Sequence, residues 1–370
     1  MRKIYINVTK TELPSLVKYN RYLKNIWRSA WITNNGQYVR QLESRLAEYL
    51  GVKYLLLVAN GTLAIQLAIK ALKLQGEIIT TPFTFPATTN AIIWEGLTPV
   101  FADIDPETFN INPEEIEKKI TPRTSAILAV HVYGNPCHNG KIKKIAARHR
   151  LKIIYDAAHA FGVSYQGRSV LKWGDISTLS FHATKIFSTA EGGAVIVKSK
   201  KIYERLKLLR NFGIKNEEEV ELAGINAKMN ELQAALGLCN LDLVDRKIEK
   251  NKKIFKLYRQ SLGINRLLMF QKLISAKHNY CYMPILFPNR RIRDSVYTRF
   301  LRSGIKPRKY FYPDLTAFEY IKKLSGKNLY SSMTISRNIA ARVLCLPIYS
   351  SLKFGDIKTI VGIINKELNS

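Results

Sequence analysis

The chain has 370 residues, which at roughly 100–200 residues per domain predicts two or three domains with a substantial hydrophobic core. Its 46% hydrophobic and 23% charged residues are ordinary for a soluble globular protein and exclude disordered, collagen-like and disulfide-scaffold chains. The charge balance is unusual, because 58 Lys and Arg residues against 28 Asp and Glu residues give a formal net charge of +30.

A net charge of this size favours association with polyanions such as nucleic acid, anionic membranes or phosphorylated metabolites. The basic residues are dispersed, however, and the richest stretch, residues 246–256, lies in a helical pattern rather than in a tail. No helix-turn-helix, RRM signature or basic tail is visible, so a basic nucleic-acid-binding protein is a remote alternative. A dispersed charge governs solubility and long-range steering and does not identify a ligand.

The four cysteines lie far apart, with no CxxC pair and no Cys/His spacing typical of zinc, so we predict no metal site. So few thiols fit a reducing compartment. The opening residues, MRKIYINVTKTELPS, contain no apolar run long enough for a signal peptide, and no run of about 18 apolar residues predicts a transmembrane helix. We therefore expect a cytoplasmic protein without membrane insertion.

From about residue 37, strand and helix patterns alternate along the chain. The spacing of apolar residues predicts a helix over 37–50, a buried strand over 54–59 (YLLLVA) and a helix over 61–74. Further strands are predicted at 77–81, 99–103, 126–132 and 151–156, and further helices at 87–95, 113–120 and 141–150. This alternation indicates an α/β protein with a mainly parallel sheet covered on both faces.

The second half of the chain has a different pattern. One long helical pattern runs from Asn230 to about Leu262 and is followed by a predicted strand at 280–287 and a helix at 294–303. A final amphipathic helix is predicted near 356–368. We interpret this half as a smaller α+β domain that is entered through the long helix.

Two motifs in the first half have the chemistry of a cofactor site. Asn60-Gly61-Thr62 follows a buried strand and opens a helix, where free N–H groups and the positive end of the helix dipole favour a phosphate. The alternative for this motif is an ordinary helix cap. Asp156 ends the strand LKIIYD and so lies at the sheet edge where parallel-sheet proteins bind ligands. Its alternative is to cap a helix starting at residues 157–159.

A third motif, STLSFHATK, contains Ser180 and Lys185 among small and aromatic residues with few charges. A desolvated lysine has a depressed pKa and becomes a nucleophilic amine able to form a Schiff base. His159, three residues after Asp156, either shares this site or is an ordinary buried histidine. A phosphate cradle, a buried carboxylate and such a lysine are the parts that pyridoxal phosphate requires.

An ordered series of segments along nearly the whole chain resembles the DegT/DnrJ/StrS-type aminotransferases, which are pyridoxal-phosphate enzymes of nucleotide sugars. The segments are VANGTLAIQLAI, TTPFTFPATTNAI, TPVFADIDPETFNINPEEIE, TPRTSAILAVHVYGNP, YDAAHAFG, SFHATKIFSTAEGGAVI, LLRNFGI, GINAKMNELQAALGL and VLCLPIYSSL. The resemblance implies the aspartate-aminotransferase-like fold of type I. We expect a large domain over 1–245, with an N-terminal arm and a mainly parallel seven-stranded sheet, and a small α+β C-terminal domain over 246–370.

The resemblance also implies roles for the candidate residues around the cofactor. Lys185 would form the Schiff base with pyridoxal 5'-phosphate, and Asp156 would pair with the pyridine nitrogen. Gly61 and Thr62, together with the Ser180 hydroxyl, would bind the phosphate. Because related sugar dehydratases carry His in place of the Schiff-base lysine, the retained Lys185 favours transamination.

Three further positions follow from the same resemblance. Phe85 would stack on the cofactor ring, and Asn226 would reach the phosphate in the partner subunit, so we expect a homodimer with shared active sites. His159 stands where the family usually has Gln and would bond the cofactor's 3-hydroxyl or approach the substrate. Protonation of its imidazole would make activity more sensitive to pH. A second departure is Ala227-Lys228, which replaces a commoner aromatic-Arg pair at the expected subunit interface.

The pairing of YDAAHAFG with SFHATKIF, and the segment WITNNG, is most similar to the subgroup that makes dTDP-4-amino-4,6-dideoxy-D-glucose. The implied reaction transfers an amine from L-glutamate to a nucleotide-linked 4-keto-6-deoxy sugar, dTDP-4-dehydro-6-deoxy-D-glucose. Its product would serve lipopolysaccharide (O-antigen) or other glycan biosynthesis. A 3-keto sugar, or a keto sugar linked to UDP or GDP, is the alternative substrate.

Overall fold

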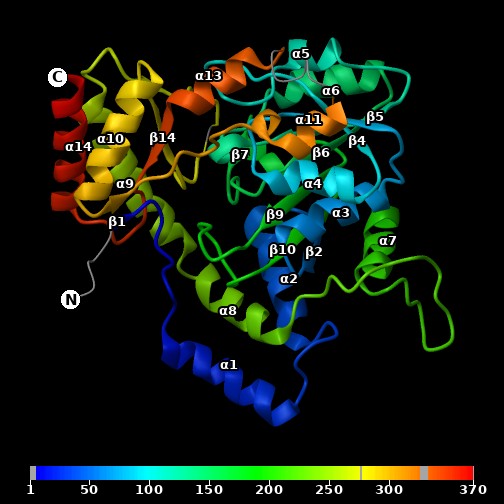
Figure 1. The fold of residues 1–370 in the computed structure, drawn as a ribbon. Coiled ribbons are helices and arrows are strands. Elements are labelled where there is room, and N and C mark those ends of the chain that lie inside the picture. The colour runs from blue at the N-terminus through cyan, green and yellow to red at the C-terminus, as the bar shows by residue number, and fades with distance from the viewer. Residues whose placement is uncertain (1–5, 276, 326–331, 370) are drawn as a thin grey trace.

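The computed structural model describes residues 6–275, 277–325 and 332–369, and its largest feature is a seven-stranded sheet between two layers of helices (Figure 1). In spatial order the strands are β2 (Tyr54–Val58), β10 (Gly193–Val197), β9 (Ile176–Ser180), β6 (Lys152–Asp156), β5 (Thr124–Val130), β3 (Glu77–Thr80) and β4 (Thr98–Phe101). Only β10 runs against the others, pairing antiparallel with β2 and β9. The mainly parallel seven-stranded sheet is therefore confirmed.

The strands of this sheet are buried on both faces, because alternate side chains enter different cores. In β2, Leu55 and Leu57 join one apolar cluster, whereas Leu56 and Val58 join the other. Helices α2 (Gln37–Leu50), α6 (Asn139–Arg148) and α8 (Glu231–Leu241) cover the first cluster, and α3 (Gly61–Ala71), α4 (Pro86–Trp94) and α7 (Lys200–Arg210) cover the second. The continuous apolar runs seen in the sequence are thus strands with helices on each side.

A second, three-stranded antiparallel sheet has a core of its own. Its strands are β11 (Met269–Phe270), β12 (Met283–Leu286) and β14 (Val343–Leu346), and its helices are α9 (Val244–Leu262), α10 (Arg290–Arg302) and α14 (Phe354–Leu368). Helix α9 contributes Val244 and Ile248 to the large-sheet core but Ile254 and Tyr258 to the small-sheet core. The domain boundary between residues 245 and 246 stays a prediction.

The remaining elements are short or lie at the periphery. They are β1 (Ile6–Asn7), α1 (Leu16–Ser29), α5 (Pro113–Glu117), β7 (Ser164–Tyr165), β8 (Arg168–Ser169), β13 (Ile305–Lys306), α11 (Glu319–Ser325) and α13 (Thr334–Arg342). The N-terminal segment is held at both ends. Strand β1 pairs with β13, and the Tyr19 hydroxyl of α1 donates to the Leu232 carbonyl of α8 (3.1 Å).

Two predicted helices differ from the structure. The pattern from Asn230 to about Leu262 is not one helix but two, α8 and α9, separated at Asp242. The Asp242 carboxylate forms ion pairs with Lys18 of α1 and Arg45 of α2, so the break lies where distant elements hold the chain. The helix predicted over 294–303 begins earlier, as α10.

Helix α10 begins at Arg290 because Asn289 caps it: the Asn289 Oδ1 accepts from the Ile292 N–H (2.9 Å). Sequence periodicity did not predict α1, α7, α13 or β14.

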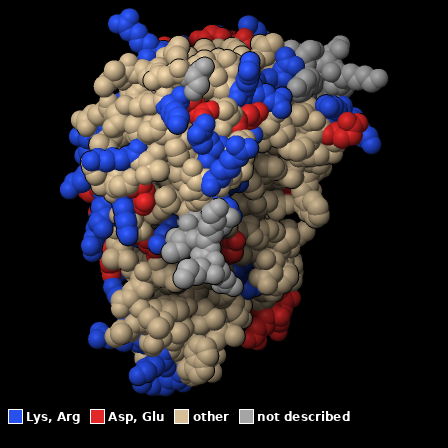
Figure 2. Space-filling model, turned by 60° about the vertical axis from the view of Figure 1, so that its left-hand side comes forward, with Lys and Arg blue, Asp and Glu red and all other residues tan. Residues whose placement is uncertain are grey.

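On the face drawn in Figure 2, charge is scattered rather than gathered into one continuous patch. Lys and Arg side chains there outnumber Asp and Glu and lie in small groups between uncharged residues. In the described ranges, no helix is long and apolar enough to cross a membrane. No three His, Cys, Asp or Glu side chains there lie close enough together to hold a metal ion, and all four cysteines are free.

Candidate cofactor and substrate site

One cavity of about 380 Å³ lies at the carboxyl ends of the parallel strands, where ligands bind in open α/β sheets. Seven of the eight residues proposed from the sequence line it: Gly61, Thr62, Phe85, Asp156, His159, Ser180 and Lys185. The eighth, Asn226, is exposed and does not line this chain's own cavity. It belongs to the segment between α7 and α8, which projects from the body of the molecule (Figure 1).

The start of α3 and the end of β9 together form a cradle that is suited to binding a phosphate. The helix-cap alternative holds for Asn60, whose Oδ1 accepts from the Leu63 N–H (2.9 Å). The N–H groups of Gly61 and Thr62 have no acceptor among the described residues, and they lie at the positive end of the helix dipole. A Cβ on Gly61 would lie 2.8 Å from the Ser180 Cβ. The missing side chain therefore lets the start of α3 approach the end of β9 closely, which brings the free N–H groups and the Ser180 side chain together.

Asp156 is a buried carboxylate without an ion-pair partner among the described residues. Its Oδ2 accepts from the Thr88 hydroxyl (2.8 Å) and its Oδ1 from the Ala158 N–H (3.0 Å). Burial raises the pKa of Asp156, and these hydrogen bonds and the charge of Lys185 oppose the rise. The following residues form turns, so the helix-cap alternative is wrong. A carboxylate held in this way suits a cationic ring nitrogen.

Lys185 is half-buried, and its Nζ makes no hydrogen bond or ion pair within the described part of the chain. Burial lowers its pKa to about 8, although nearby Cys281 and Asp156 act in the opposite direction. A lysine with such a pKa is a neutral, nucleophilic amine in a sizeable fraction of molecules near neutral pH. The amine, the carboxylate and the anion cradle in one cavity fit pyridoxal phosphate.

His159 is buried, and its Nδ1 accepts from the Tyr133 N–H (3.2 Å). Burial, with the positive charges of Lys185 and Arg308, holds the pKa of His159 well below its usual range. The imidazole is therefore neutral, with its proton on Nε2. The structure does not support the pH sensitivity that the replacement of Gln by His suggested.

Ala227 and Lys228 lie at the base of the projecting segment. The buried Ala227 donates its N–H to the Arg210 carbonyl (3.0 Å). The Lys228 Nζ donates to the Asn211 Oδ1 (2.7 Å) and lies 4.8 Å from the centre of the Phe212 ring. Both residues thus close the base of the segment that carries Asn226.

Sequence reasoning missed several residues of the cavity. Thr88 holds the Asp156 carboxylate, and its position three residues after Phe85, at one helical spacing, was a usable signal. Arg308, Tyr310 and Phe311 reach the cavity from the far end of the chain. No local motif marks these three, because only the packing of the small sheet against the large one places them here.

Comparison with known proteins supplies the family. Residues 17–365 match the DegT/DnrJ/EryC1/StrS aminotransferase family. The chain belongs to this family. It is therefore a pyridoxal-phosphate-dependent sugar aminotransferase.

Relatives match over almost the full length. The dTDP-4-amino-4,6-dideoxy-D-glucose transaminase of Escherichia coli is 43% identical over 351 residues, which cover 94% of each chain. The protein of the same name from Shigella dysenteriae is 42% identical over 98% of each chain. The crystal structure of DesI in the presence of its TDP-sugar product is 32% identical, with a TM-score of 0.91 over 99% of this chain and 93% of that one. This confirms the aminotransferase fold.

Proposed function

We propose that this aminotransferase transfers the amine of L-glutamate to dTDP-4-dehydro-6-deoxy-D-glucose and so makes dTDP-4-amino-4,6-dideoxy-D-glucose. The observation that carries the proposal is the near-full-length similarity to transaminases named for this product. The product would enter a surface polysaccharide such as O-antigen. The free cysteines fit the reducing cytoplasm in which we expect the protein to act.

Each residue at the base of the cavity has a proposed task. When bound, pyridoxal phosphate supplies an aldehyde for amines and a ring that accepts the electron pair left by a departing proton. The N–H groups of Gly61 and Thr62 and the Ser180 hydroxyl would hold its phosphate. Asp156 would hold a proton on the ring nitrogen, and Phe85 would cover one face of the ring.

Lys185 is the proposed proton carrier. Its Nζ would take the proton from the α-carbon of the amino donor and, in the second half-reaction, return a proton to the sugar carbon that gains nitrogen. With a pKa lowered to about 8, the amine is neutral often enough to accept that proton. The neutral His159 would donate its Nε2–H to the 3-hydroxyl of the cofactor.

We infer that the working unit is a homodimer in which the partner subunit's Asn226 completes each site. Among the exposed large apolar side chains of the described surface, two groups lie close together in the sequence. They are Leu16, Val17, Trp27, Trp31 and Ile32 in and after α1, and Phe212, Ile214, Val220 and Ile225 in the projecting segment. Exposed apolar groups of this size mark interaction surfaces. A second copy would cover them and bring the segment that carries Asn226 to the neighbouring cavity.

The direct test is product analysis. Purified protein is incubated with L-glutamate and a panel of 4-keto and 3-keto sugars linked to dTDP, UDP or GDP, and NMR identifies the aminated carbon. We expect an amine at carbon 4 of the dTDP-linked 6-deoxy sugar. Preferred amination of another ketone or nucleotide would overturn the proposed substrate. Lys185→Ala should abolish multiple turnover, and borohydride reduction of wild-type holoenzyme should leave the pyridoxyl group on Lys185.

A further inference from the structure

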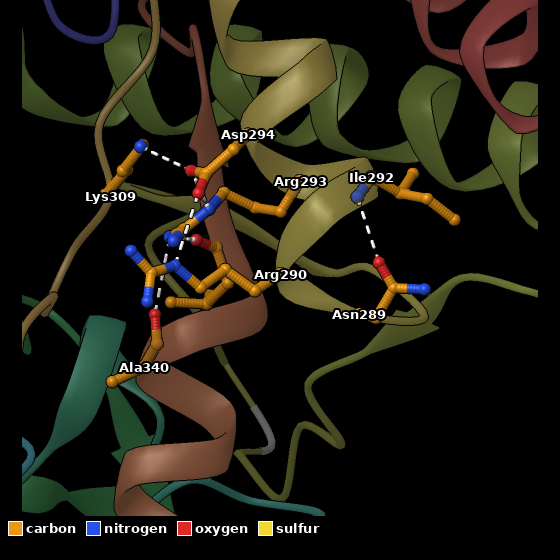
Figure 3. A network of polar contacts seen from close by, with 8 residues as sticks. Asn289, Arg290, Ile292, Arg293, Asp294, Lys309 and Ala340 are labelled. Atoms are coloured by element: carbon orange, nitrogen blue, oxygen red, sulfur yellow. Dashed lines mark hydrogen bonds and ion pairs between the residues drawn. The ribbon is translucent and has the colours of Figure 1, made fainter.

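One wall of the cavity is tied to helix α10 by a residue that stands between its lining side chains. Residues 308–311, here called the cavity wall, line the cavity with every side chain except that of Lys309. The Lys309 Nζ bonds instead to the Asp294 carboxylate of α10 (Figure 3). The cavity wall is therefore held from a helix that lies outside the lining of the cavity.

The Asp294 carboxylate is shared by three cations (Figure 3). Besides Lys309, it pairs with the Nε of Arg293 (2.8 Å) and the Nε of Arg290 (3.3 Å). Among the residues that the structure describes, these three cations have no other acidic partner. Loss of the carboxylate would leave the fully buried Arg293 without an anion, which is costly in a protein interior. The anchor of the cavity wall is thus part of a network that the fold needs.

Arg293 fixes this network against buried backbone. Its Nη1 donates to the carbonyls of Ala340 (3.4 Å) and Val343 (3.3 Å), at the end of α13 and the start of β14. Its guanidinium carbon also lies 4.5 Å from the centre of the Tyr312 ring, just beyond the cavity wall. The carboxylate that holds Lys309 is therefore set in the packed interior and is not one half of a loose surface pair.

The cavity wall packs on two residues that have proposed roles at the cofactor ring. The centre of the Tyr310 ring lies 6.5 Å from that of Phe85 and 5.8 Å from that of His159. The Phe311 ring lies within 3° of parallel to the His159 ring, at 6.1 Å. A shift of the wall would therefore displace the side chains that are proposed to cover the ring and to bond its 3-hydroxyl.

We propose that Asp294 is a positioning residue of this transaminase. Through Lys309 it holds the cavity wall against Phe85 and His159, and so fixes the orientation of the cofactor ring. The proposal rests on the cofactor contacts proposed above for Phe85 and His159. Asp294 touches neither cofactor nor substrate, yet a displacement of about 1 Å at a reacting group can cost on the order of 100-fold in rate.

The test compares Lys309→Met with Lys309→Arg and with a matched control, Arg299→Met. Lys309→Met releases the wall but leaves the buried Arg293 paired, so the fold is kept. Lys309→Arg keeps a cation that can reach Asp294. Arg299 belongs to the same helix and pairs with Glu367 of α14, so the control removes an α10 ion pair that does not hold the wall.

The first readout needs no cofactor. The amides of Arg308 and Cys345 donate to each other's carbonyls (3.1 and 2.8 Å) and hold the wall to β14, so their hydrogen exchange reports its mobility. In cofactor-free Lys309→Met we expect both amides to exchange roughly tenfold faster, and in Arg299→Met to exchange as in the wild type.

Two further readouts use the loaded enzyme. Circular dichroism of the cofactor band, which depends on the orientation of the ring, should change in Lys309→Met and not in Arg299→Met. We expect kcat for amination of the sugar to fall roughly 10- to 100-fold in Lys309→Met and to return most of the way in Lys309→Arg. Adding Lys309→Met to Asp294→Asn should cause no further loss, because both changes break the same contact.

The outcomes separate the two proposals. Unchanged exchange and dichroism in Lys309→Met overturn the role of Asp294, whatever happens to kcat. Equal changes in Arg299→Met, or losses that multiply when Lys309→Met and Asp294→Asn are combined, overturn it as well. A wild type that aminates no nucleotide sugar overturns the proposed function instead, and the exchange and dichroism measurements still decide the role of Asp294.

Discussion

Gly61 lies against Ser180 at the end of β9, so closely that a side chain on Gly61 would collide with it. We expect Gly61→Val to weaken pyridoxal phosphate binding by roughly tenfold or more, since forcing extra carbon atoms into a packed site costs about 1–3 kcal/mol. Absorbance titration of the cofactor-free protein measures the affinity. The control is Gly140→Ala in the first turn of α6, where a Cβ meets nothing within 4 Å. If Gly61→Val and the wild type bound the cofactor equally tightly, the cofactor phosphate would not bind at this turn.

Asp156 should make the stability of the cofactor-free protein depend on pH. Burial raises its pKa, so the folded chain binds this proton more tightly than the unfolded chain does. The resulting stabilisation is fully present below the ordinary Asp pKa of about 4 and is lost as the pH rises through the raised value. We expect the melting temperature of Asp156→Asn, relative to the wild type, to increase between about pH 4 and pH 8. Parallel pH profiles of the two proteins would contradict the raised pKa.

The site residues differ in how far sequence could place them. Gly61 and Asp156 each stand at the end of a strand in a parallel sheet, and such ends meet at one edge, so their motifs were enough. Arg308 was not predictable in this way. Its place depends on a β-bridge to Cys345 and on the anchor of Lys309 at α10, and neither contact has a pattern in the neighbouring sequence.

Among the elements, α2 matches its predicted range residue for residue, because a clear apolar stripe lies between Gly36 and Gly51 at its two ends. The break between α8 and α9 was not predictable, since ion pairs from α1 and α2 hold Asp242 there. The antiparallel direction of β10 was also not predictable from the sequence. A buried apolar run has the same composition whether its neighbours run parallel or antiparallel to it.

The projecting segment between α7 and α8 allows a sharp test of site sharing. Lys185→Ala and Asn226→Ala chains carrying different tags are co-expressed, and the mixed dimer is purified through both tags. If the partner subunit's Asn226 completes each site, one site of the mixed dimer carries both substitutions and the other carries neither. We expect about half of the wild-type activity per dimer, as in a mixed dimer of wild type and Lys185→Ala. An activity no higher than that of the Asn226→Ala homodimer would assign Asn226 to its own chain's cavity or to neither.

At the scale of the whole molecule, charge is distributed unevenly along the chain. Residues 246–309 contain 18 Lys and Arg residues and only 2 Asp and Glu residues. Much of this segment forms α9, α10 and the loops that lead to Arg308. Of these cations Arg308 lines the cavity. An excess of positive charge in this part of the chain would draw in a substrate that carries a diphosphate.

The steering predicts a dependence on salt. We expect the KM for the sugar nucleotide to rise between about 20 and 300 mM KCl while kcat changes little. Salt screens the long-range attraction between enzyme and substrate but does not affect the chemical steps. The pair Lys253→Glu and Lys256→Glu on the exposed side of α9 should raise KM at low salt more than the pair Lys143→Glu and Lys144→Glu on α6. If KM did not change with salt and were equal in the two double variants, the net charge would serve solubility and not substrate binding.

The position of β2 at one edge of the large sheet affects how the protein is made. Its one neighbouring strand is β10, which is synthesised much later, after all the other strands of that sheet. On the ribosome, the backbone of β2 therefore stays unpaired while most of the chain emerges, and unpaired strands are prone to join other chains. A nascent polypeptide that stops short of β10 lacks the strand that holds β2 in the sheet. We therefore expect this enzyme to need chaperone protection until late in its synthesis, and to bind its coenzyme only after β10 has been made.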